Sequence, residues 1–236
     1  MNRLYRSTFQ AIHTLFRFRG ISAFISRLSK IWLRHSQTCD IMRSFRIDGV
    51  IDGGAYQGEF ASLVRVSIPE ADLVCVEPQA NCVRILQNDG YRVIEAALWY
   101  KEDTLTLSQP LPDGTSCTVV SADGTESLTP KVDVKATRLD SIPVRGNRLF
   151  IKLDLQGAEE QALEGMGELW KRCVMIQLEI GMEPHGNYTV LHKLLASHDF
   201  IEYATVNQFF TSDGRVQEAD KIWLRRDVWT ELFKTT

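Results

Sequence analysis

The part of the sequence that most constrains the fold is residues 47–66, where three kinds of segment follow one another. Residues 47–51 are short and apolar enough for a strand buried in a parallel sheet. A glycine-rich turn comes next, and residues 60–66 then place their apolar side chains on one face of a helix. A strand, a glycine turn and a helix in this order open many α/β units. The segment therefore predicts an α/β fold with this turn at the head of a parallel sheet.

The turn reads Asp52-Gly53-Gly54-Ala55-Tyr56-Gln57-Gly58-Glu59. Its glycines let the backbone come close to a ligand, but their spacing is not the G-x-G-x-x-G of dinucleotide binders. A carboxylate at Asp52 would repel a pyrophosphate. It would suit a ligand with a cationic amine and a cationic sulfonium, such as S-adenosyl-L-methionine (SAM). The alternative interpretation is a structural turn with a capping aspartate. The predicted cofactor-binding residues of this segment are Asp52, Gly53, Gly54, Ala55, Gly58 and Glu59.

From residue 48 onward, strand-like and helix-like segments alternate, which predicts a doubly wound, mostly parallel sheet. Further strands are expected at residues 72–76, 91–97, 149–154, 174–180, 200–206 and 221–224. Further helices are expected at residues 81–88, 158–166 and 188–197. After the third strand the helix pattern is missing. Short β-like runs and turn signals over residues 100–136 predict a β-rich insertion in its place.

Residues 1–47 differ from the rest of the chain in charge. They carry nine Lys/Arg and one acid, Asp40, whereas the remaining residues carry 18 Lys/Arg and 29 Asp/Glu. Apolar residues between positions 21 and 32 recur at helical spacing. We therefore expect a basic amphipathic helical extension at 1–47 and one main domain at 48–236. The extension could form a lid on the acceptor site, lie on an anionic membrane surface, form a dimer contact or serve as an organellar transit peptide.

The five cysteines are scattered and form no C-x-x-C pair, which favours a reducing compartment and argues against a disulfide framework or a zinc site. No apolar run approaches the roughly 18 residues that cross a bilayer. The basic stretch lacks the interleaved aromatic residues of a nucleic-acid-binding module. The expectation is a cytoplasmic protein, with membrane contact at most peripheral, and without a nucleic-acid partner.

Ligands of open α/β sheets bind beyond the carboxyl ends of the strands, so the strand ends define a predicted cofactor site. The second strand ends at Glu77-Pro78, 25 residues after Asp52. An acid about 20 residues beyond a glycine turn commonly binds ribose hydroxyls. The third strand ends near Ala97, which is small and apolar, so an adenine ring could lie flat there. The alternatives are a solvated acid at Glu77 and ordinary packing at Ala97.

The fourth and fifth strands supply the candidates for catalysis. Lys152 and Asp154 share one side of the fourth strand, because side chains alternate with a period of two. Asp154 could act as a general base on an acceptor hydroxyl, or could hold a divalent metal such as Mg²⁺ that acidifies it. Lys152 could orient the substrate or keep Asp154 ionised. Glu179, near the end of the fifth strand, and His185, after it, are further base or substrate-contact candidates. The alternative is a Lys–Asp pair that caps the next helix.

Together these segments resemble the FkbM-type SAM-dependent methyltransferases. The resemblance spans residues 48–225 and rests on the segments 50–60, 76–78, 97–98, 137–140, 151–159 and 178–179. Its most specific part is the block Lys152-Leu153-Asp154-Leu155-Gln156-Gly157-Ala158-Glu159. The chain departs from the family at Trp99-Tyr100, where a small polar residue is more usual. This departure affects the expected contact with the edge of the adenine ring.

The resemblance implies a class I methyltransferase (Rossmann-like) fold and methyl transfer from SAM, usually to a hydroxyl oxygen of a sugar, a lipid-linked glycan or a natural product. It implies that Asp52, Gly54 and Gly58 bind the amino-acid part of the cofactor. Glu77 would bind its ribose, and Asp154 would lie beside the transferred methyl group. The expected function is O-methylation of a small-molecule or glycan acceptor. Two alternatives stay open: a SAM- or adenosine-binding module without catalysis, and a nucleotide-sugar or NAD enzyme on a similar sheet.

Overall fold

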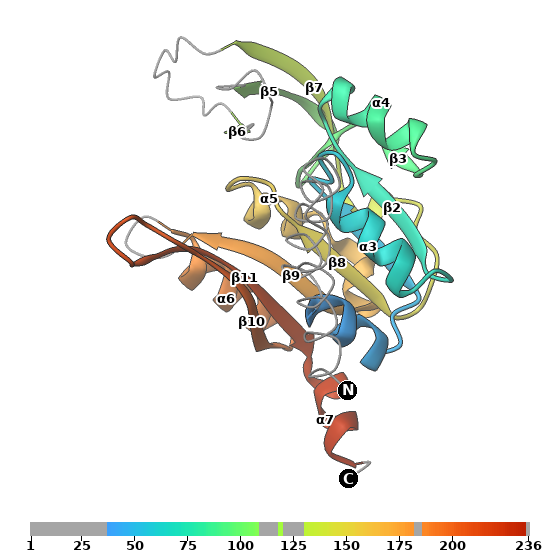
Figure 1. The fold of residues 1–236 in the computed structure, drawn as a ribbon, viewed down its shortest axis with the longest axis vertical. Coiled ribbons are helices and arrows are strands. Elements are labelled where there is room, and N and C mark those ends of the chain that lie inside the picture. Colours follow the sequence, from blue (N-terminus) through green and yellow to red (C-terminus); the bar gives the residue numbers. More distant parts are fainter. Residues whose placement is uncertain (1–36, 109–117, 120–129, 182–185, 235–236) are drawn as a thin grey trace, which may run out of the picture.

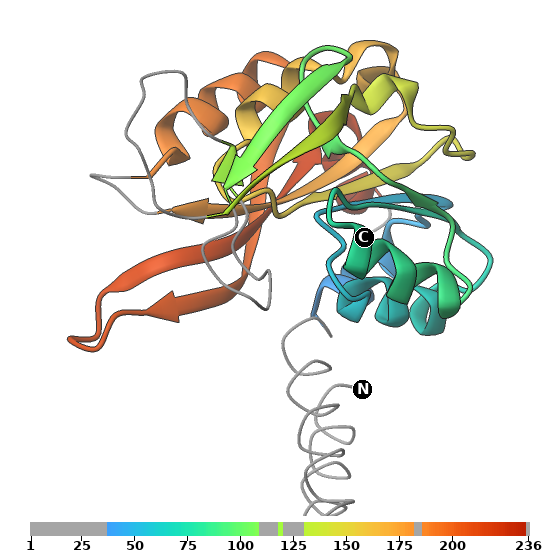
Figure 2. The same ribbon diagram turned by 90° about the horizontal axis from the view of Figure 1, so that it is seen from above.

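The computed structural model describes residues 37–108, 118–119, 130–181 and 186–234. These residues form a seven-stranded sheet with helices on both faces and a smaller four-stranded sheet (Figure 1, Figure 2). Most of the predicted extension, residues 1–36, and the predicted site residue His185 lie outside the described residues.

The elements alternate along the chain as the sequence suggests. The larger sheet consists of β1 (Gly49–Gly53), β2 (Asp72–Val76), β3 (Val93–Ile94), β8 (Leu149–Leu153), β9 (Cys173–Gly181), β10 (Phe200–Phe210) and β11 (Val216–Arg225). The smaller sheet consists of β4 (Ala97–Leu98), β5 (Asp103–Ser108), β6 (Thr118–Val119) and β7 (Lys131–Thr137). The helices are α3 (Glu59–Ser67), α4 (Ala80–Asn88), α5 (Glu159–Glu164), α6 (Tyr188–Ser197) and α7 (Arg226–Lys234), with 3₁₀ turns η1 (Leu139–Ser141) and η2 (Gly167–Lys171).

The strand order across the larger sheet is β10-β11-β9-β8-β1-β2-β3. The five strands from β3 to β9 pair in parallel, whereas β11 runs antiparallel to both β9 and β10. The chain moves outward from β1 to β3 and then places β8 on the other side of β1, so the order reverses between β1 and β8. Ligands of open sheets bind at such a reversal. The predicted doubly wound, mostly parallel sheet is confirmed.

Alternating side chains of the strands build a hydrophobic core on each face of the sheet. Val50 and Phe150 face one core, while their neighbours Ile51 and Ile151 face the other. The helix α3 covers the first core, and α5 and α6 cover the second (Figure 2). Fully burying one such apolar side chain contributes about 1.5–3 kcal/mol. The central strands β1 and β8 are therefore buried on both faces of the sheet.

Residues 37–47 pack on the main domain. Residues 37–44 are helical and precede β1, and Met42, Phe45 and Ile47 are buried in the same core as Val50. Thr38 donates a hydrogen bond from its hydroxyl to the Gln177 side chain at 2.9 Å. The apolar side chains of this segment are therefore covered by the domain itself.

The third strand differs from its prediction over residues 91–97. Only Val93–Ile94 pairs with β2, and Ala97–Leu98 pairs with β7 in the smaller sheet instead. The chain turns between them, where the Ala96 N–H donates to the Ile94 carbonyl. The β-rich insertion predicted for residues 100–136 is confirmed in the described residues, because β5, β6 and β7 form this second sheet.

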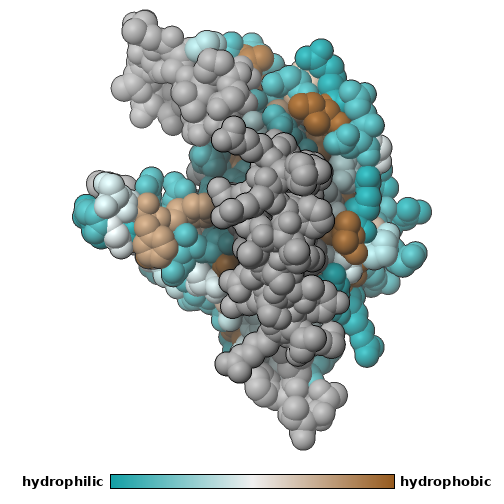
Figure 3. All heavy atoms as spheres, viewed as in Figure 1, coloured by the Kyte–Doolittle hydropathy of each residue, from teal (hydrophilic) through white to brown (hydrophobic). Residues whose placement is uncertain are grey.

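The sequence analysis predicted neither the helix α7 nor the full length of the β10–β11 hairpin. The two strands are longer than predicted and contain three register irregularities along their pairing. The hairpin projects away from the sheet on the same side as β5 and β7 (Figure 1). Phe210 near its tip is 59% exposed, and Figure 3 shows hydrophobic surface on this arm. Among the described residues, no helix combines the length and the apolar character that crossing a membrane requires.

Candidate active site

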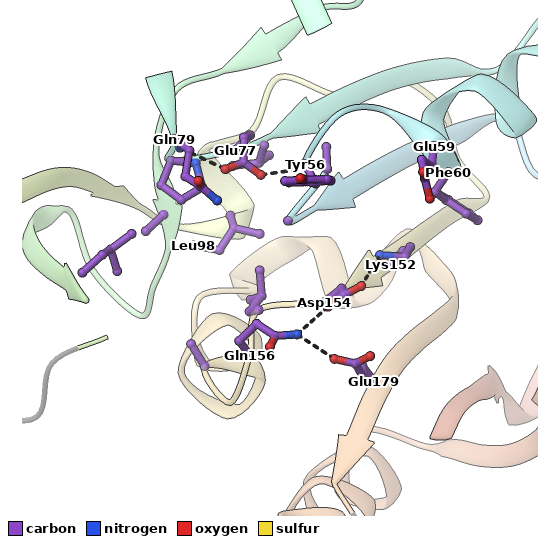
Figure 4. A pocket seen from close by; sticks show the side chains of 18 of the residues that line it. Tyr56, Glu59, Phe60, Glu77, Gln79, Leu98, Lys152, Asp154, Gln156 and Glu179 are labelled. Atoms are coloured by element: carbon purple, nitrogen blue, oxygen red, sulfur yellow. Dashed lines mark hydrogen bonds and ion pairs between the residues drawn. The ribbon is translucent and has the colours of Figure 1, made fainter. Parts of the chain in front are cut away.

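A cavity of about 560 Å³ opens beyond the carboxyl ends of β1, β2, β8 and β9 (Figure 4). This is the position that the strand-order reversal predicts. Nine of the predicted site residues line it: Gly54, Ala55, Glu59, Glu77, Pro78, Ala97, Lys152, Asp154 and Glu179. Three further predicted residues of the segment 52–59 do not line the cavity: Asp52, Gly53 and Gly58.

Gly54 brings the turn after β1 against the loop after β8. Its φ is +72°, and a Cβ atom at this position would overlap the carbonyl oxygen of Asp154. The Gly54 and Ala55 N–H groups both donate to the Val76 carbonyl, at 3.0 and 3.2 Å. The absence of a side chain thus allows three strand ends to meet at the cavity.

Glu77 is held in place by backbone groups. One carboxylate oxygen accepts from the Tyr56 N–H at 2.8 Å, and the other accepts from the Gln79 N–H at 2.9 Å. The side chain is only 2% exposed, and burial raises its pKa although both hydrogen bonds oppose the shift. Each carboxylate oxygen has a second lone pair. Glu77 can therefore still accept hydrogen bonds from two neighbouring hydroxyls of a ligand in the cavity.

Small apolar residues form the wall beside Glu77. Ala96, Ala97 and Leu98 follow β3, and Leu107 reaches the cavity from β5 of the smaller sheet. Ala97 is 9% exposed. An apolar surface of this kind suits the flat face of an aromatic ring, as the sequence predicted for adenine.

Lys152 is a buried ammonium beneath the cavity. Its Nζ lies 3.3 Å from Asp154 Oδ2 and 3.8 Å from Asp52 Oδ1. Asp52 and Lys152 are register partners on adjacent parallel strands, so their side chains lie on one face of the sheet. Burial lowers the pKa of Lys152, but the charges of Asp154, Asp52 and Asp220 outweigh it and leave the pKa raised. Lys152 therefore stays charged at neutral pH.

Asp52 is placed differently from its predicted role. Its side chain is fully buried, and neither carboxylate oxygen has a hydrogen-bond partner among the described residues. Burial raises its pKa to about 6, although the Lys152 charge opposes this shift. Direct contact between Asp52 and a ligand in the cavity would require this side chain to move. Gly58, at φ +83°, instead lets α3 pack closely against Leu86 of α4.

Asp154 and Glu179 share the amide group of Gln156. The Gln156 Nε2 donates to Asp154 Oδ1 at 3.2 Å and to Glu179 Oε2 at 2.8 Å (Figure 4). Burial favours the neutral form of Asp154, but Lys152 and the hydrogen bond from Gln156 outweigh it and lower its pKa. Burial and the neighbouring charges of Asp154, Asp220 and Glu218 raise the pKa of Glu179 to about 8. The two carboxyl groups therefore have pKa values on opposite sides of neutrality.

Glu159 fixes the loop that carries Asp154 and Gln156. Its side chain is 1% exposed and accepts from the Leu155 N–H at 2.9 Å and the Gly157 N–H at 3.3 Å. The Asn187 side chain donates to its other oxygen at 3.3 Å. Glu159 thus holds the loop after β8 against the start of α6. It belongs to the block at 152–159, but the sequence alone gave it no role.

Three lining residues of the hairpin were missed by the sequence analysis: Phe209 of β10, and Glu218 and Asp220 of β11. Because β11 runs antiparallel to β9, its beginning lies beside the end of β9, and Asp220 is the register partner of Glu179. The acids at 218 and 220 precede the apolar run that predicted the last strand. Only knowledge of the antiparallel pairing would have placed them at the site.

The structure gives no support for a metal at Asp154. Its two oxygens contact Lys152 and Gln156. Within the described ranges, no three His, Cys, Asp or Glu residues form a group that could hold a metal ion.

The cavity fits SAM in size and in chemistry. Its volume lies within the roughly 300–1,000 Å³ that small-molecule and cofactor sites span. Glu77 offers acceptors for two hydroxyls, and an apolar wall lies beside it. Lys152 is the one Lys or Arg among the described lining residues, against several carboxyl groups. Such a lining favours a cationic ligand and disfavours a pyrophosphate.

Comparison with known proteins agrees with these features. A family model of the methyltransferase FkbM domain matches residues 52–203. A search of curated proteins finds no significant match.

Among solved structures, methyltransferase FkbM from Methylobacillus flagellatus shares 15% identity over 75% of this chain and 43% of that chain, with a TM-score of 0.47. This chain therefore covers less than half of that protein. Magnesium protoporphyrin IX methyltransferase from Synechocystis, crystallised with SAM, shares 11% identity over 81% of this chain and 80% of that chain, with a TM-score of 0.46. A putative RNA methyltransferase from Pyrococcus horikoshii shares 13% identity over 89% and 87% of the two chains, with a TM-score of 0.45.

Proposed function

The chain belongs to the FkbM family of SAM-dependent methyltransferases, and from this premise we propose that it methylates a hydroxyl oxygen of a sugar, a glycan or a natural-product-like small molecule. Its fold is that of a class I methyltransferase, a Rossmann-like doubly wound sheet. The observation that carries the proposal is the arrangement of one cavity. The ribose-type acid Glu77 lies on one side and the carboxyl pair Asp154 and Glu179 lies on the other (Figure 4).

The half of the cavity at β1 and β2 is assigned to the cofactor. The Glu77 carboxylate would accept from the ribose hydroxyls, and the wall at Ala97 would contact the adenine ring. The backbone of residues 54–56 approaches the cavity closely enough to contact the amino-acid part. When bound, SAM supplies a methyl group activated by a positively charged sulfur.

The half of the cavity at β8, β9 and β11 is assigned to the acceptor. Asp154 and Glu179 lie there with Glu218 and Asp220, and Phe209 adds an apolar surface. Hydroxyl groups of an acceptor can donate to these carboxyl groups. In-line attack on the methyl group depends on correct positioning, which accounts for much of the rate in such reactions. A carboxylate of this half takes the proton of the attacking hydroxyl.

The proposal also places the protein in the cytoplasm, with a small-molecule or glycan acceptor rather than a nucleic acid. It is supported by the four cysteines among the described residues, which form no disulfide and are all buried. Cysteines of this kind are typical of a reducing compartment. Contact of the basic extension predicted at residues 1–47 with a membrane surface or with a second copy belongs to the same proposal.

The direct test uses SAM with a labelled methyl group and a panel of acceptors. The panel contains neutral sugars, amino sugars, polyols, short glycans and hydroxylated natural products, each with Mg²⁺ and with a chelator. We expect labelled product and release of S-adenosylhomocysteine with at least one acceptor. Asp154→Asn should lower turnover by about 10²-fold, because the variant lacks a carboxylate that positions the acceptor. Turnover by Asp89→Asn, at an exposed residue after α4, should stay unchanged.

Other results would support a different function. Binding of S-adenosylhomocysteine without methylation of any acceptor would indicate a non-catalytic module. Tight binding of NAD or a UDP-sugar, without binding of S-adenosylhomocysteine, would indicate a nucleotide-sugar or NAD enzyme. Turnover that disappears with the chelator and returns with Mg²⁺ would show that a metal takes part.

A further inference from the structure

The carboxyl groups of Asp154 and Glu179 differ in what surrounds them. Asp154 contacts the Lys152 ammonium through Oδ2 at 3.3 Å and the Gln156 amide through Oδ1 at 3.2 Å. Both of its oxygens therefore have a donor. Ionised carboxylates with two such donors are weak bases, because a proton would displace these contacts.

Glu179 instead faces other acids. Its register partner on β11 is Asp220, and Asp154 and Glu218 are also close enough to act on its charge. Lys152 forms ion pairs with Asp52 and Asp154, and the described residues provide no ion pair for Glu179. Its carboxylate accepts from the Gln156 amide at 2.8 Å. A carboxyl group in this position binds a proton more readily than Asp154 does.

Gln156 has a left-handed backbone conformation, which is uncommon for a residue with a side chain. It is a non-glycine residue at φ +55°, and its side chain is exposed at the cavity rather than packed in a core. Residues held in such conformations cluster at functional sites. The amide of Gln156 joins the loop after β8 to the end of β9 by donating to one carboxyl group of each.

We propose that Glu179, rather than Asp154, is the base that takes the proton of the acceptor hydroxyl, and that Gln156 is a positioning residue that holds the two carboxyl groups together. Asp154 remains ionised beside Lys152 and orients the acceptor. This inference rests on the proposed methyl transfer, because it names the group that receives the proton in that reaction.

The acceptor oxygen forms a bond to the methyl carbon while the carbon–sulfur bond breaks, and its electron pair stays on sulfur. The hydroxyl proton moves to the Glu179 carboxylate. The products are the methyl ether, S-adenosylhomocysteine and a protonated Glu179, which then releases its proton to water.

The pH dependence follows from the groups that face Glu179. They are Lys152 from β8, Asp154 from the loop after β8, and Asp220 and Glu218 from β11. Burial and the three acids raise the pKa of Glu179 to about 8. A general base acts in its deprotonated form, so kcat/KM should rise with pH and level off above about 8. The same pKa lies close to working pH, where general bases are most effective.

The first experiment needs no acceptor. Glutamate labelled with ¹³C at the side-chain carboxyl is incorporated into the full chain, and its resonances are followed by NMR from pH 5 to 10. We expect one glutamate to titrate near 8 and its resonance to be absent in Glu179→Gln. Glu218→Gln should lower that pKa, because it removes a neighbouring negative charge. A resonance near 8 that persists in Glu179→Gln, or no glutamate titrating above 7, would overturn the proposal.

The second experiment measures kcat/KM against pH with an acceptor that the panel identifies. Glu179→Gln should abolish the rise of kcat/KM near pH 8. It should also lower kcat by about 10²–10⁴-fold, the usual contribution of a general base. Gln156→Glu keeps the shape of the side chain but adds a negative charge between the carboxyl groups of Asp154 and Glu179. The rise of kcat/KM should therefore move to higher pH. Gln87→Glu, on the exposed face of α4, adds the same charge elsewhere and should leave the profile unchanged.

The two proposals fail in different ways. If no acceptor is methylated, the proposed function fails. A different outcome is methylation in which Asp154→Asn abolishes the rise of kcat/KM near pH 8 and Glu179→Gln retains it. In that case the proposed methyl transfer is supported and the assignment of Glu179 as the base is wrong. If Gln156→Glu leaves the profile unchanged, Gln156 has no positioning role.

Discussion

At the scale of single residues, the site depends on how closely the turn after β1 approaches the loop after β8. The two loops meet at Gly54, where the backbone has a positive φ and no room exists for a side chain. Tyr56 and Gln156, on the two facing loops, also have positive φ values of 48° and 55°. All three residues line the cavity. Two of the four described non-glycine residues with positive φ therefore lie where the loops form the binding surface.

Gly54→Ala tests this close approach, and Gly90→Ala is its matched control. Both glycines have positive φ, but nothing lies within 4 Å of a Cβ at Gly90. Gly90→Ala should cost only the conformational penalty of about 1–2 kcal/mol. Gly54→Ala adds the overlap with Asp154 and should cost about 2–5 kcal/mol in total. Urea unfolding measures both values, and equal losses for the two variants would contradict the close approach.

Most of the residue positions could be predicted because they follow from strand ends. Glu77, Asp154 and Glu179 each come after a recognisable apolar run, and parallel strands end at one edge. Asp52 was predicted to face the ligand, yet it lies buried beside Lys152. Its orientation depends on the pairing of β1 with β8, a contact between residues 100 positions apart, which local sequence patterns do not reveal.

At the scale of elements, two appendages of different origin form the outer wall of the cavity. The β-rich insertion supplies Leu107 from β5, and the β10–β11 hairpin supplies Phe209, Glu218 and Asp220. The insertion could be recognised from its short β-like runs. The contribution of the hairpin could not, because it depends on the antiparallel direction of β11 and on strands longer than the apolar pattern shows. We infer that the hairpin selects the acceptor, since Leu107 of the insertion belongs to the apolar wall beside Glu77, in the half assigned to the cofactor.

Phe209→Ala and Phe210→Ala test the role of the hairpin. Phe209 lines the cavity, whereas its neighbour Phe210 is 59% exposed and does not. Loss of the Phe209 ring should raise the KM of the acceptor about 5- to 30-fold, which corresponds to about 1–2 kcal/mol of apolar contact. Binding of S-adenosylhomocysteine should stay within about twofold in both variants. The hairpin would not form the acceptor wall if the two variants raised the KM equally.

At the scale of the whole molecule, the fold brings residues from positions 54 to 220 into one cavity with two chemically different halves. The half at β1 and β2 has a backbone-held acid and an apolar wall. The half at β8, β9 and β11 has carboxyl groups with separated pKa values above a buried ammonium. Acid–base roles in enzymes are often divided between such pairs. The arrangement therefore suits a nucleoside-type cofactor on one side and proton removal on the other.

The proposed function depends most on the assignment of Glu77 to the ribose of the cofactor. The measurement that tests it is a calorimetric titration of S-adenosylhomocysteine into the wild-type protein and into Glu77→Gln. We expect one binding site in the wild type and an affinity at least 10-fold lower in the variant, because hydrogen bonds to a charged acceptor contribute about 1.5–3 kcal/mol. Absence of binding to the wild-type protein, or equal affinity in the two proteins, would contradict the account.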